Sequence, residues 1–125
     1  MTAPGRRETG TKAEIIALAH LEQQGLRHVA SNYRCRMGEI DLIMQDGTVL
    51  VFAEVRYRNS TNFGSAAESV TPAKQQRIIN TANHYLQSRH KRKPPPCRFD
   101  MIAIVGKELQ DIQWLQDAFQ IGGKY

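Results

Sequence analysis

The stretch 38–58 constrains the fold of this chain more than any other part of its sequence. It holds two mainly apolar runs separated by Asp46-Gly47. An Asp-Gly pair between apolar runs is the strongest short-range signal of a β-hairpin. Acidic residues interrupt both runs, with Glu39 and Asp41 in the first and Glu54 in the second. Acidic residues within apolar strands are unfavourable unless another group compensates their charge.

The register of this hairpin predicts where the acids lie. If Asp46-Gly47 is a two-residue loop, Asp41 falls opposite Phe52 and Glu39 falls opposite Glu54. Because side chains alternate between faces along a strand, all three carboxylates then point to one side. Directly opposed like charges destabilise a sheet. The pattern therefore predicts a compensating divalent cation.

Length and charge narrow the class of protein. The chain has 125 residues and a formal net charge of +5, which indicate one domain with an anionic partner, nucleic acid first. Its two cysteines lack metal-ligand spacing, and free thiols are the simpler interpretation. No apolar run approaches the ~20 residues of a membrane span, and the N-terminus has no secretory signal. We therefore expect a cytoplasmic protein without membrane contact.

We expect a flexible basic arm over 1–10, a single domain over 11–120 and a loose tail over 121–125. Thr11 and Glu14 fit a capping box, which predicts a helix from Thr11 to about Gln24 that ends before Gly25. Glu14 also lies on the apolar face of this helix. It therefore has two open interpretations, a cap or a site residue that points inward.

The remaining segments predict further strands and a second helix. Residues 27–35 indicate a strand, and 49–58 indicate a central strand whose second half turns polar. Thr71-Pro72 begins a helix that runs to about Gln87, with Gln75 facing inward and Arg77 outward. Residues 98–105 form a strand, and 112–115 a short last strand. The order is α-β-β-β-α-β with a final β, which predicts an α/β fold with a mixed central sheet flanked by helices.

Basic residues gather near the ends of these elements and in the loop before the three prolines 94–96. Most of them are explained by a solvated surface, but clustered arginines also suit phosphate groups. A basic loop of this kind provides salt-dependent affinity that is independent of base sequence. The residues expected to contact nucleic acid are Arg34, Arg36, Arg58, Lys74, Arg89, Lys91, Arg92 and Lys93.

The acids and a neighbouring cation suggest metal-assisted hydrolysis of a phosphodiester. Carboxylates hold Mg²⁺ or Mn²⁺ through oxygen ligands, and the metal then activates water and neutralises phosphoryl charge. A cation such as Arg56 can stabilise the transition state. The sequence contains no zinc-protease histidine spacing, no phosphate-cradling glycine loop and no nucleophile elbow.

Several segments together resemble the YraN family of uncharacterised bacterial proteins, over roughly residues 10–119. More distantly, that family is similar to archaeal Holliday-junction resolvases and to the restriction-endonuclease-like superfamily. The segments that carry the resemblance are Glu14, Gly38-Glu39-Ile40-Asp41-Leu42-Ile43, Phe52-Ala53-Glu54-Val55-Arg56-Tyr57-Arg58, Phe63-Gly64, Val70-Thr71, Lys74-Gln75 and Arg98-Phe99-Asp100.

The resemblance implies the αβββαβ core of PD-(D/E)xK nucleases. Asp41 and Glu54 would be the metal-binding acids, with Glu39 or Glu14 assisting. Gln75 would match a polar position on the following helix. Arg56 stands where the superfamily usually has Lys, and because an arginine stays protonated, it cannot act as a general base. Resolvase-like relatives act as dimers, so the resemblance leaves a homodimer open.

Two hypotheses follow for the function. The first is a Mg²⁺-dependent endonuclease, or nuclease-like protein, that acts on DNA, including branched or single-stranded intermediates. Its catalytic residues would be Asp41, Glu54, Arg56 and Gln75. The alternative is a non-catalytic nucleic-acid-binding module on the same fold, which Arg56 favours.

Overall fold

The structure is a computed structural model that describes residues 6–58, 70–106 and 111–120. The predicted loop 59–69, with Phe63-Gly64, and the predicted tail 121–125 lie outside the described residues. Within the described ranges, the chain forms two helices and a five-stranded sheet. In chain order, these are α1 (Arg6–Gln23), β1 (Arg27–Cys35), β2 (Gly38–Asp46), β3 (Val49–Arg58), α2 (Pro72–Arg89), β4 (Cys97–Val105) and β5 (Asp111–Phe119).

The sheet has the spatial order β1-β2-β3-β4-β5. Among the described strands, only β3 and β4 pair in parallel, and the other neighbouring strands are antiparallel. A parallel pair needs a crossover connection, and α2 lies in that connection. The predicted α/β fold with a mixed sheet is confirmed.

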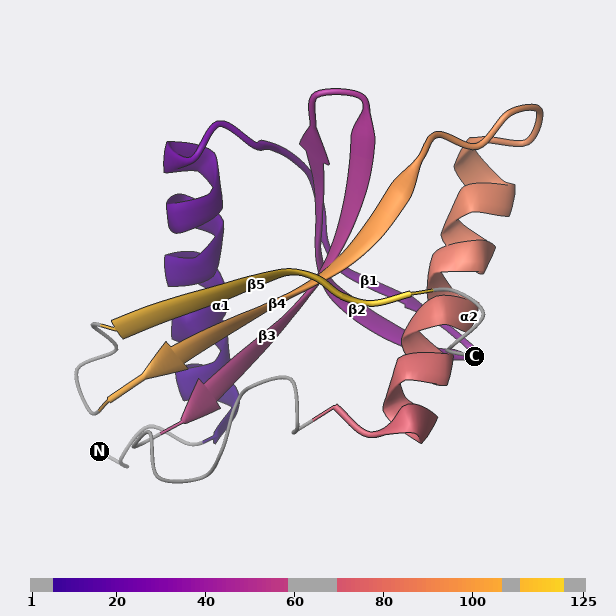
Figure 1. The fold of residues 1–125 in the computed structure, drawn as a ribbon. Coiled ribbons are helices and arrows are strands. Elements are labelled where there is room, and N and C mark those ends of the chain that lie inside the picture. Colours follow the sequence, from indigo (N-terminus) through magenta and orange to yellow (C-terminus); the bar gives the residue numbers. More distant parts are fainter. Residues whose placement is uncertain (1–5, 59–69, 107–110, 121–125) are drawn as a thin grey trace.

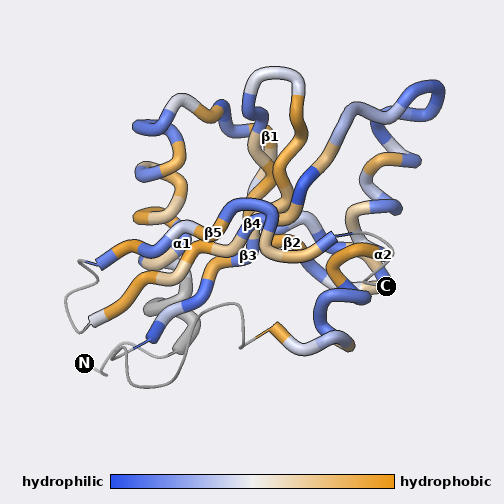
Figure 2. Tube along the Cα trace, viewed as in Figure 1, coloured by the Kyte–Doolittle hydropathy of each residue, from blue (hydrophilic) through white to orange (hydrophobic). Residues whose placement is uncertain are grey.

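One helix covers each face of the sheet, with α1 and α2 on opposite sides in Figure 1. The face under α1 buries Ala17 and Leu21 against Val51, Ala53 and other strand residues. The face under α2 buries a second cluster, built around aromatic side chains of β3 and β4. Figure 2 shows the strands as mainly hydrophobic where the layers meet and α2 as mixed. The faces of β3 follow the predicted alternation, because Val51 and Ala53 lie on the α1 side and Leu50 and Phe52 on the α2 side.

The helix ends agree with the sequence signals except at the start of α1. Thr71 caps α2 by accepting a hydrogen bond from the Lys74 N–H at 3.2 Å. After α1, Gly25 adopts a left-handed φ of 98°, which suits a glycine following a helix. However, α1 begins at Arg6, so Thr11 lies inside the helix and the predicted capping box at its start is wrong. Neither described helix is long and apolar enough to cross a membrane.

The register of the central hairpin differs from the predicted one. Asp46 pairs with Val49 and Ile43 pairs with Phe52, so the two loop residues are Gly47-Thr48. Gly47 has a φ of 60°, and glycine adopts this left-handed conformation readily. The expected pairing of Asp41 with Phe52, and of Glu39 with Glu54, is therefore wrong. The shift moves Asp41 up the strand to the level of Glu54.

The last strand, β5, is longer than predicted because a bulge lets it continue. The pairing shifts between Phe99↔Phe119 and Met101↔Leu115. Asp117 takes a φ of 54° within this irregular segment, and its N–H donates to Asp100 at 2.9 Å. Beyond the bulge, the ring of Phe119 stacks on Phe99 at 5.0 Å between centroids.

Candidate functional site

The site lies where the sheet divides. Pairing between β2 and β3 ends at Leu42 and Ala53, and Asp41 and Glu54 are the next residues on the two strands. In Figure 1, β3 and β4 then run toward the α1 side, whereas the end of β1 and the start of β2 lie toward α2. Asp41 bridges the opening, because its Oδ2 accepts a hydrogen bond from the Val55 N–H at 2.8 Å. A side chain thus replaces the main-chain acceptor that a continuing ladder would supply.

Asp41 and Glu54 form a hydrogen-bonded carboxyl pair in which Glu54 donates and Asp41 accepts. Burial, followed by the charge of Asp41, raises the pKa of Glu54 to about 8, despite the opposing charge of Arg56. Burial also raises the pKa of Asp41, against the Val55 N–H bond that favours its ionised form. The pair therefore keeps one proton near neutral pH and carries a single negative charge.

Two further acids border this pair. Burial and the charge of Asp41 raise the pKa of Glu14, which reaches the pair from α1. Glu39 forms an ion pair with Arg34 at 3.2 Å on the outer side. With its amide nitrogen turned toward the acids, Asn32 donates to Glu14 Oε1 at 3.3 Å and to Glu39 Oε2 at 3.2 Å. The structure therefore brings Glu14 to the site, as one of its two interpretations required.

The predicted metal site is wrong. In the three described ranges, no group of three or more His, Cys, Asp or Glu side chains could hold a metal ion. The acids are satisfied in other ways: Asp41 accepts hydrogen bonds, and Glu54 contacts Arg56 Nη2 at 2.9 Å. Protonation and arginine contacts thus take the compensating role that the sequence assigned to Mg²⁺ or Mn²⁺ at Asp41, Glu54, Glu39 and Glu14.

A pocket of about 250 Å³ opens in front of the carboxyl pair. Three cations from two elements face it: Arg56 of β3, and Lys74 and Arg77 of α2. Arg77 is exposed, as predicted, and it also borders the pocket because the turn into β2 packs against α2 beside it. Gly38 makes this approach possible, since a Cβ there would lie 3.0 Å from Thr81 Oγ1. The remaining lining residues are Gly38, Glu39, Asp41, Glu54 and Ile78.

Gln75 does not line this pocket. Its amide nitrogen donates to the Val70 carbonyl at 3.0 Å, which anchors the segment just before α2. The predicted placement of an amide beside the acids therefore finds no support in the hydrogen bonds of the described residues.

The other predicted phosphate-contacting residues are distributed around the pocket and beyond it. Arg34 and Arg36 are exposed around the turn between β1 and β2, and Arg58 is half-buried at the end of β3. The Arg58 guanidinium donates to the Tyr57 carbonyl at 2.9 Å. The exposed residues at the far end of α2 and in the loop after it are Arg89, Lys91, Arg92 and Lys93.

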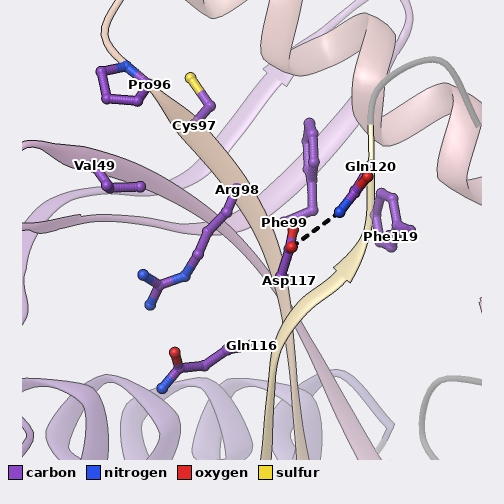
Figure 3. A pocket seen from close by; sticks show the side chains of 9 residues that line it. All are labelled: Val49, Pro96, Cys97, Arg98, Phe99, Gln116, Asp117, Phe119 and Gln120. Atoms are coloured by element: carbon purple, nitrogen blue, oxygen red, sulfur yellow. Dashed lines mark hydrogen bonds between the residues drawn. The ribbon is translucent and has the colours of Figure 1, made fainter.

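A larger pocket of about 450 Å³ lies elsewhere, where the start of β4 meets the end of β5 (Figure 3). Phe99 and Phe119 contribute to its walls, with Arg98 and the hydrogen-bonded pair Gln120 and Asp117. None of the predicted site residues lines it. Arg98 contacts Asp46 at 2.8 Å and Asp100 at 3.0 Å, so it is already engaged in tying strands together.

Asn32 and Arg77 are site residues that sequence reasoning missed. Asn32 has a φ of 54°, a left-handed conformation that asparagine tolerates better than most residues. An asparagine inside a strand-like run was a local signal that the strand is irregular there. Arg77 gave no such signal, because its position depends on how closely the β1–β2 turn approaches α2.

The order αβββαβ, the mixed sheet and acids at the end of the central strands define the class: a restriction-endonuclease-like core. The chain belongs to the uncharacterised protein family UPF0102, which residues 13–104 match. This result confirms the resemblance to YraN proteins. A UPF0102 protein of Saccharophagus degradans is 53% identical over 91% of this chain and 94% of its own length. Another, of Nitrosococcus oceani, is 50% identical over 92% of this chain and 94% of its own.

Proposed function

We propose that this protein binds nucleic acid, DNA first, through backbone phosphates and without base specificity. The observation that carries the proposal is the convergence of Arg56, Lys74 and Arg77 on one pocket. Phosphate oxygens are strong acceptors, and arginine and lysine are their usual partners in proteins. The net charge of +5 favours the same partner. A location in the cytoplasm, with the cell's DNA, is part of the proposal.

The exposed cations beyond the pocket extend the contact surface. Arg89 ends α2, and the basic loop after it continues along the same side of the molecule in Figure 1. A duplex that lies along α2 would meet the pocket at one end of the helix and this loop at the other. Contacts of this kind release counterions, so affinity falls steeply as salt rises.

Binding measured by fluorescence anisotropy from 50 to 300 mM salt tests the proposal. The variant Arg92→Ala/Lys93→Ala should lower affinity and make the slope of log K against log salt shallower by about 2. Lys12→Ala/Arg27→Ala removes the same charge on the α1 side and should leave the slope nearly unchanged. Equal effects of the two variants, or a salt-independent affinity, would contradict the proposed surface. Tighter binding of RNA than of DNA would contradict the choice of DNA.

Phosphodiester cleavage is a second candidate function, and Glu54 favours it. A carboxyl with a pKa of about 8 keeps its proton at neutral pH and can act as a general acid. As water forms the new P–O bond, the bond from phosphorus to the departing oxygen breaks and that oxygen takes the Glu54 proton. The proton that the water loses passes to solvent, from which Glu54 is protonated again. Arg56 can stabilise charge on the phosphoryl oxygens but cannot act as a base.

Cleavage is tested on linear and four-way DNA in a chelating buffer, since this route uses only side chains of the chain. Glu54→Gln retains the shape and the hydrogen bonds of the protonated acid but has no proton to transfer. Products that form with the wild type and disappear with Glu54→Gln would support the candidate. Equal product from both proteins, or none from either, would reject it.

A further inference from the structure

The described residues do not place every charge inside the pocket in an ion pair. Arg56 contacts Glu54 at 2.9 Å and offsets the single negative charge of the carboxyl pair. Glu39 is matched by Arg34 at the outer rim. Lys74 and Arg77 form no ion pair with any described residue. Among the residues that the structure describes, the pocket therefore presents two cations outside any ion pair, of which Lys74 also acts on Glu54 through its charge.

The donors and the size of the pocket specify the ligand further. Lysine offers three N–H donors and arginine five, and neither accepts a hydrogen bond. A ligand that satisfies both must carry several acceptor oxygens and about two negative charges. The volume of about 250 Å³ is below the ~300–1,000 Å³ of pockets that enclose drug-sized ligands, so it suits a phosphate group better than a whole nucleotide.

An internal phosphodiester and a terminal phosphate differ in these properties. A diester carries one negative charge, and its strand must leave the pocket in two directions. A phosphate monoester carries about −1.5 to −2 at pH 7 and presents three strong acceptor oxygens on one attachment. Two cations that form no ion pair with the described residues match the monoester better in a pocket of this size.

We infer that the pocket holds a phosphate monoester on Lys74 and Arg77, and that the ligand is the phosphorylated end of a DNA strand. This inference rests on the proposed DNA binding, because the neighbouring cations must hold the rest of the strand. Arg77 is the specificity-determining residue, and Gly38 is a positioning residue that lets the β1–β2 turn approach it.

The test compares one blunt duplex with 5′-phosphate, 3′-phosphate or hydroxyl ends, each labelled internally so that the ends stay free. Hydrogen bonds to charged groups contribute about 1.5–3 kcal/mol, so we expect one phosphorylated form to bind at least about ten-fold tighter than the hydroxyl form. Arg77→Ala should reduce this ratio to near one. The matched control Arg89→Ala, on the same helix, should weaken both forms and preserve the ratio.

The outcomes separate the inference from the function on which it rests. If all duplexes bind with equal affinity, the end-specific site is overturned while DNA binding stands. If none binds, the proposed function fails first. Inorganic phosphate and a nucleoside 5′-monophosphate are added as competitors. Displacement of the phosphorylated duplex by either competitor, at a concentration equal to the dissociation constant of the duplex, would show a free-phosphate site. That result would overturn recognition of a DNA end.

Discussion

Two acidic centres of this molecule, one on β4 and one on β3, contain the same residue types but differ in their role. On β4, Arg98 and Asp100 stand two residues apart, as Glu54 and Arg56 do on β3. Asp100 is fully buried and accepts from the Arg98 guanidinium, Trp114 Nε1 at 2.9 Å and the Asp117 N–H at 2.9 Å. Donors inside the protein thus satisfy the Asp100 carboxylate, and its role is to join strands. We call Arg98 and Asp100 the closed centre.

The centre formed by Asp41, Glu54 and Arg56 is called the open centre, because it faces a pocket. Asp41 and Glu54 share a proton, the charge of Asp41 raises the pKa of Glu54, and both residues line a pocket with the cations Lys74 and Arg77. An acidic group surrounded by donors holds a fold together, whereas two acids with shifted pKa values that line a pocket are typical of a functional site. An Arg-x-Asp or Glu-x-Arg pattern therefore does not define a role by itself, because the role depends on how many hydrogen-bond donors surround the carboxylate.

The largest effect should come from the closed centre. Asp100→Ala leaves the Arg98 guanidinium, which is 16% exposed, without its main partner, and it also removes the acceptor of two N–H groups. Breaking a buried ion pair in this way costs about 3–5 kcal/mol. Urea unfolding followed by circular dichroism measures it. Asp41→Ala is the matched variant at the open centre and should cost less; the reverse order would break the comparison.

A smaller loss is expected for Arg98→Lys. The Arg98 Nε reaches Asp100 while Nη1 reaches Asp46 at 2.8 Å, and a lysine ammonium cannot bridge both in this geometry. We expect a loss of about 2 kcal/mol in the free energy of unfolding. Asp46→Asn, which retains the Arg98–Asp100 contact, serves as the control and should cost clearly less. A neutral Arg98→Lys would mean that the fork geometry is unimportant.

The open centre should make stability depend on pH. The pKa of Glu54 is about 8 in the folded protein and is raised from an ordinary value of 4.5, so the folded state binds the extra proton. Its contribution is fully present below about pH 4.5 and is lost as pH rises toward and through 8.

Glu54→Gln mimics the protonated acid and should remove most of this loss, about 1–3 kcal/mol between pH 6 and 9. Thermal or urea unfolding at the two pH values measures the difference. Glu39→Gln, at the rim, is the control and should retain the wild-type decline. An unchanged pH profile in Glu54→Gln would remove the distinction between the two centres.

Arg56→Lys should have the smallest effect on stability, below about 1 kcal/mol. Within the described residues, Arg56 forms an ion pair from Nη2 to Glu54, and a lysine ammonium can replace this contact. The DNA dissociation constant should change less than about three-fold, since a positive charge remains in the pocket. Arg56→Gln, which removes the charge, provides the contrast in both measurements. A large loss in Arg56→Lys would show that the guanidinium plane itself is required.

Local signals were enough for most of the fold. Thr71-Pro72 and Gly25 located helix ends, and alternation along 49–58 assigned both faces of the central strand. The Asp-Gly signal located the hairpin but placed its loop one residue early, because Gly47 can occupy either central position of the turn. The length of β5 was not predicted, because it depends on a contact between distant residues: Asp100 accepts a hydrogen bond from the Asp117 N–H at the bulge.

The site was only partly predictable for a physical reason. Its acids were visible as charges in apolar strands, but their partners come from long-range packing. Arg77 reaches the pocket because the β1–β2 turn lies against α2, and Asn32 reaches Glu14 because a strand bends. The predicted metal site was wrong because two neighbouring carboxylates can be compensated by a shared proton as well as by a shared metal ion. The sequence pattern is the same in both cases.

The hydrogen bond from the Val55 N–H to Asp41 has a consequence for observation in solution. One backbone amide in the middle of β3 reports directly on a side-chain carboxylate, so its proton and nitrogen resonances should move whenever the charge of the pair changes. Exchange of that amide with solvent would likewise track how firmly Asp41 closes the divided sheet. A single backbone resonance thus gives a view of the pocket without any labelled ligand.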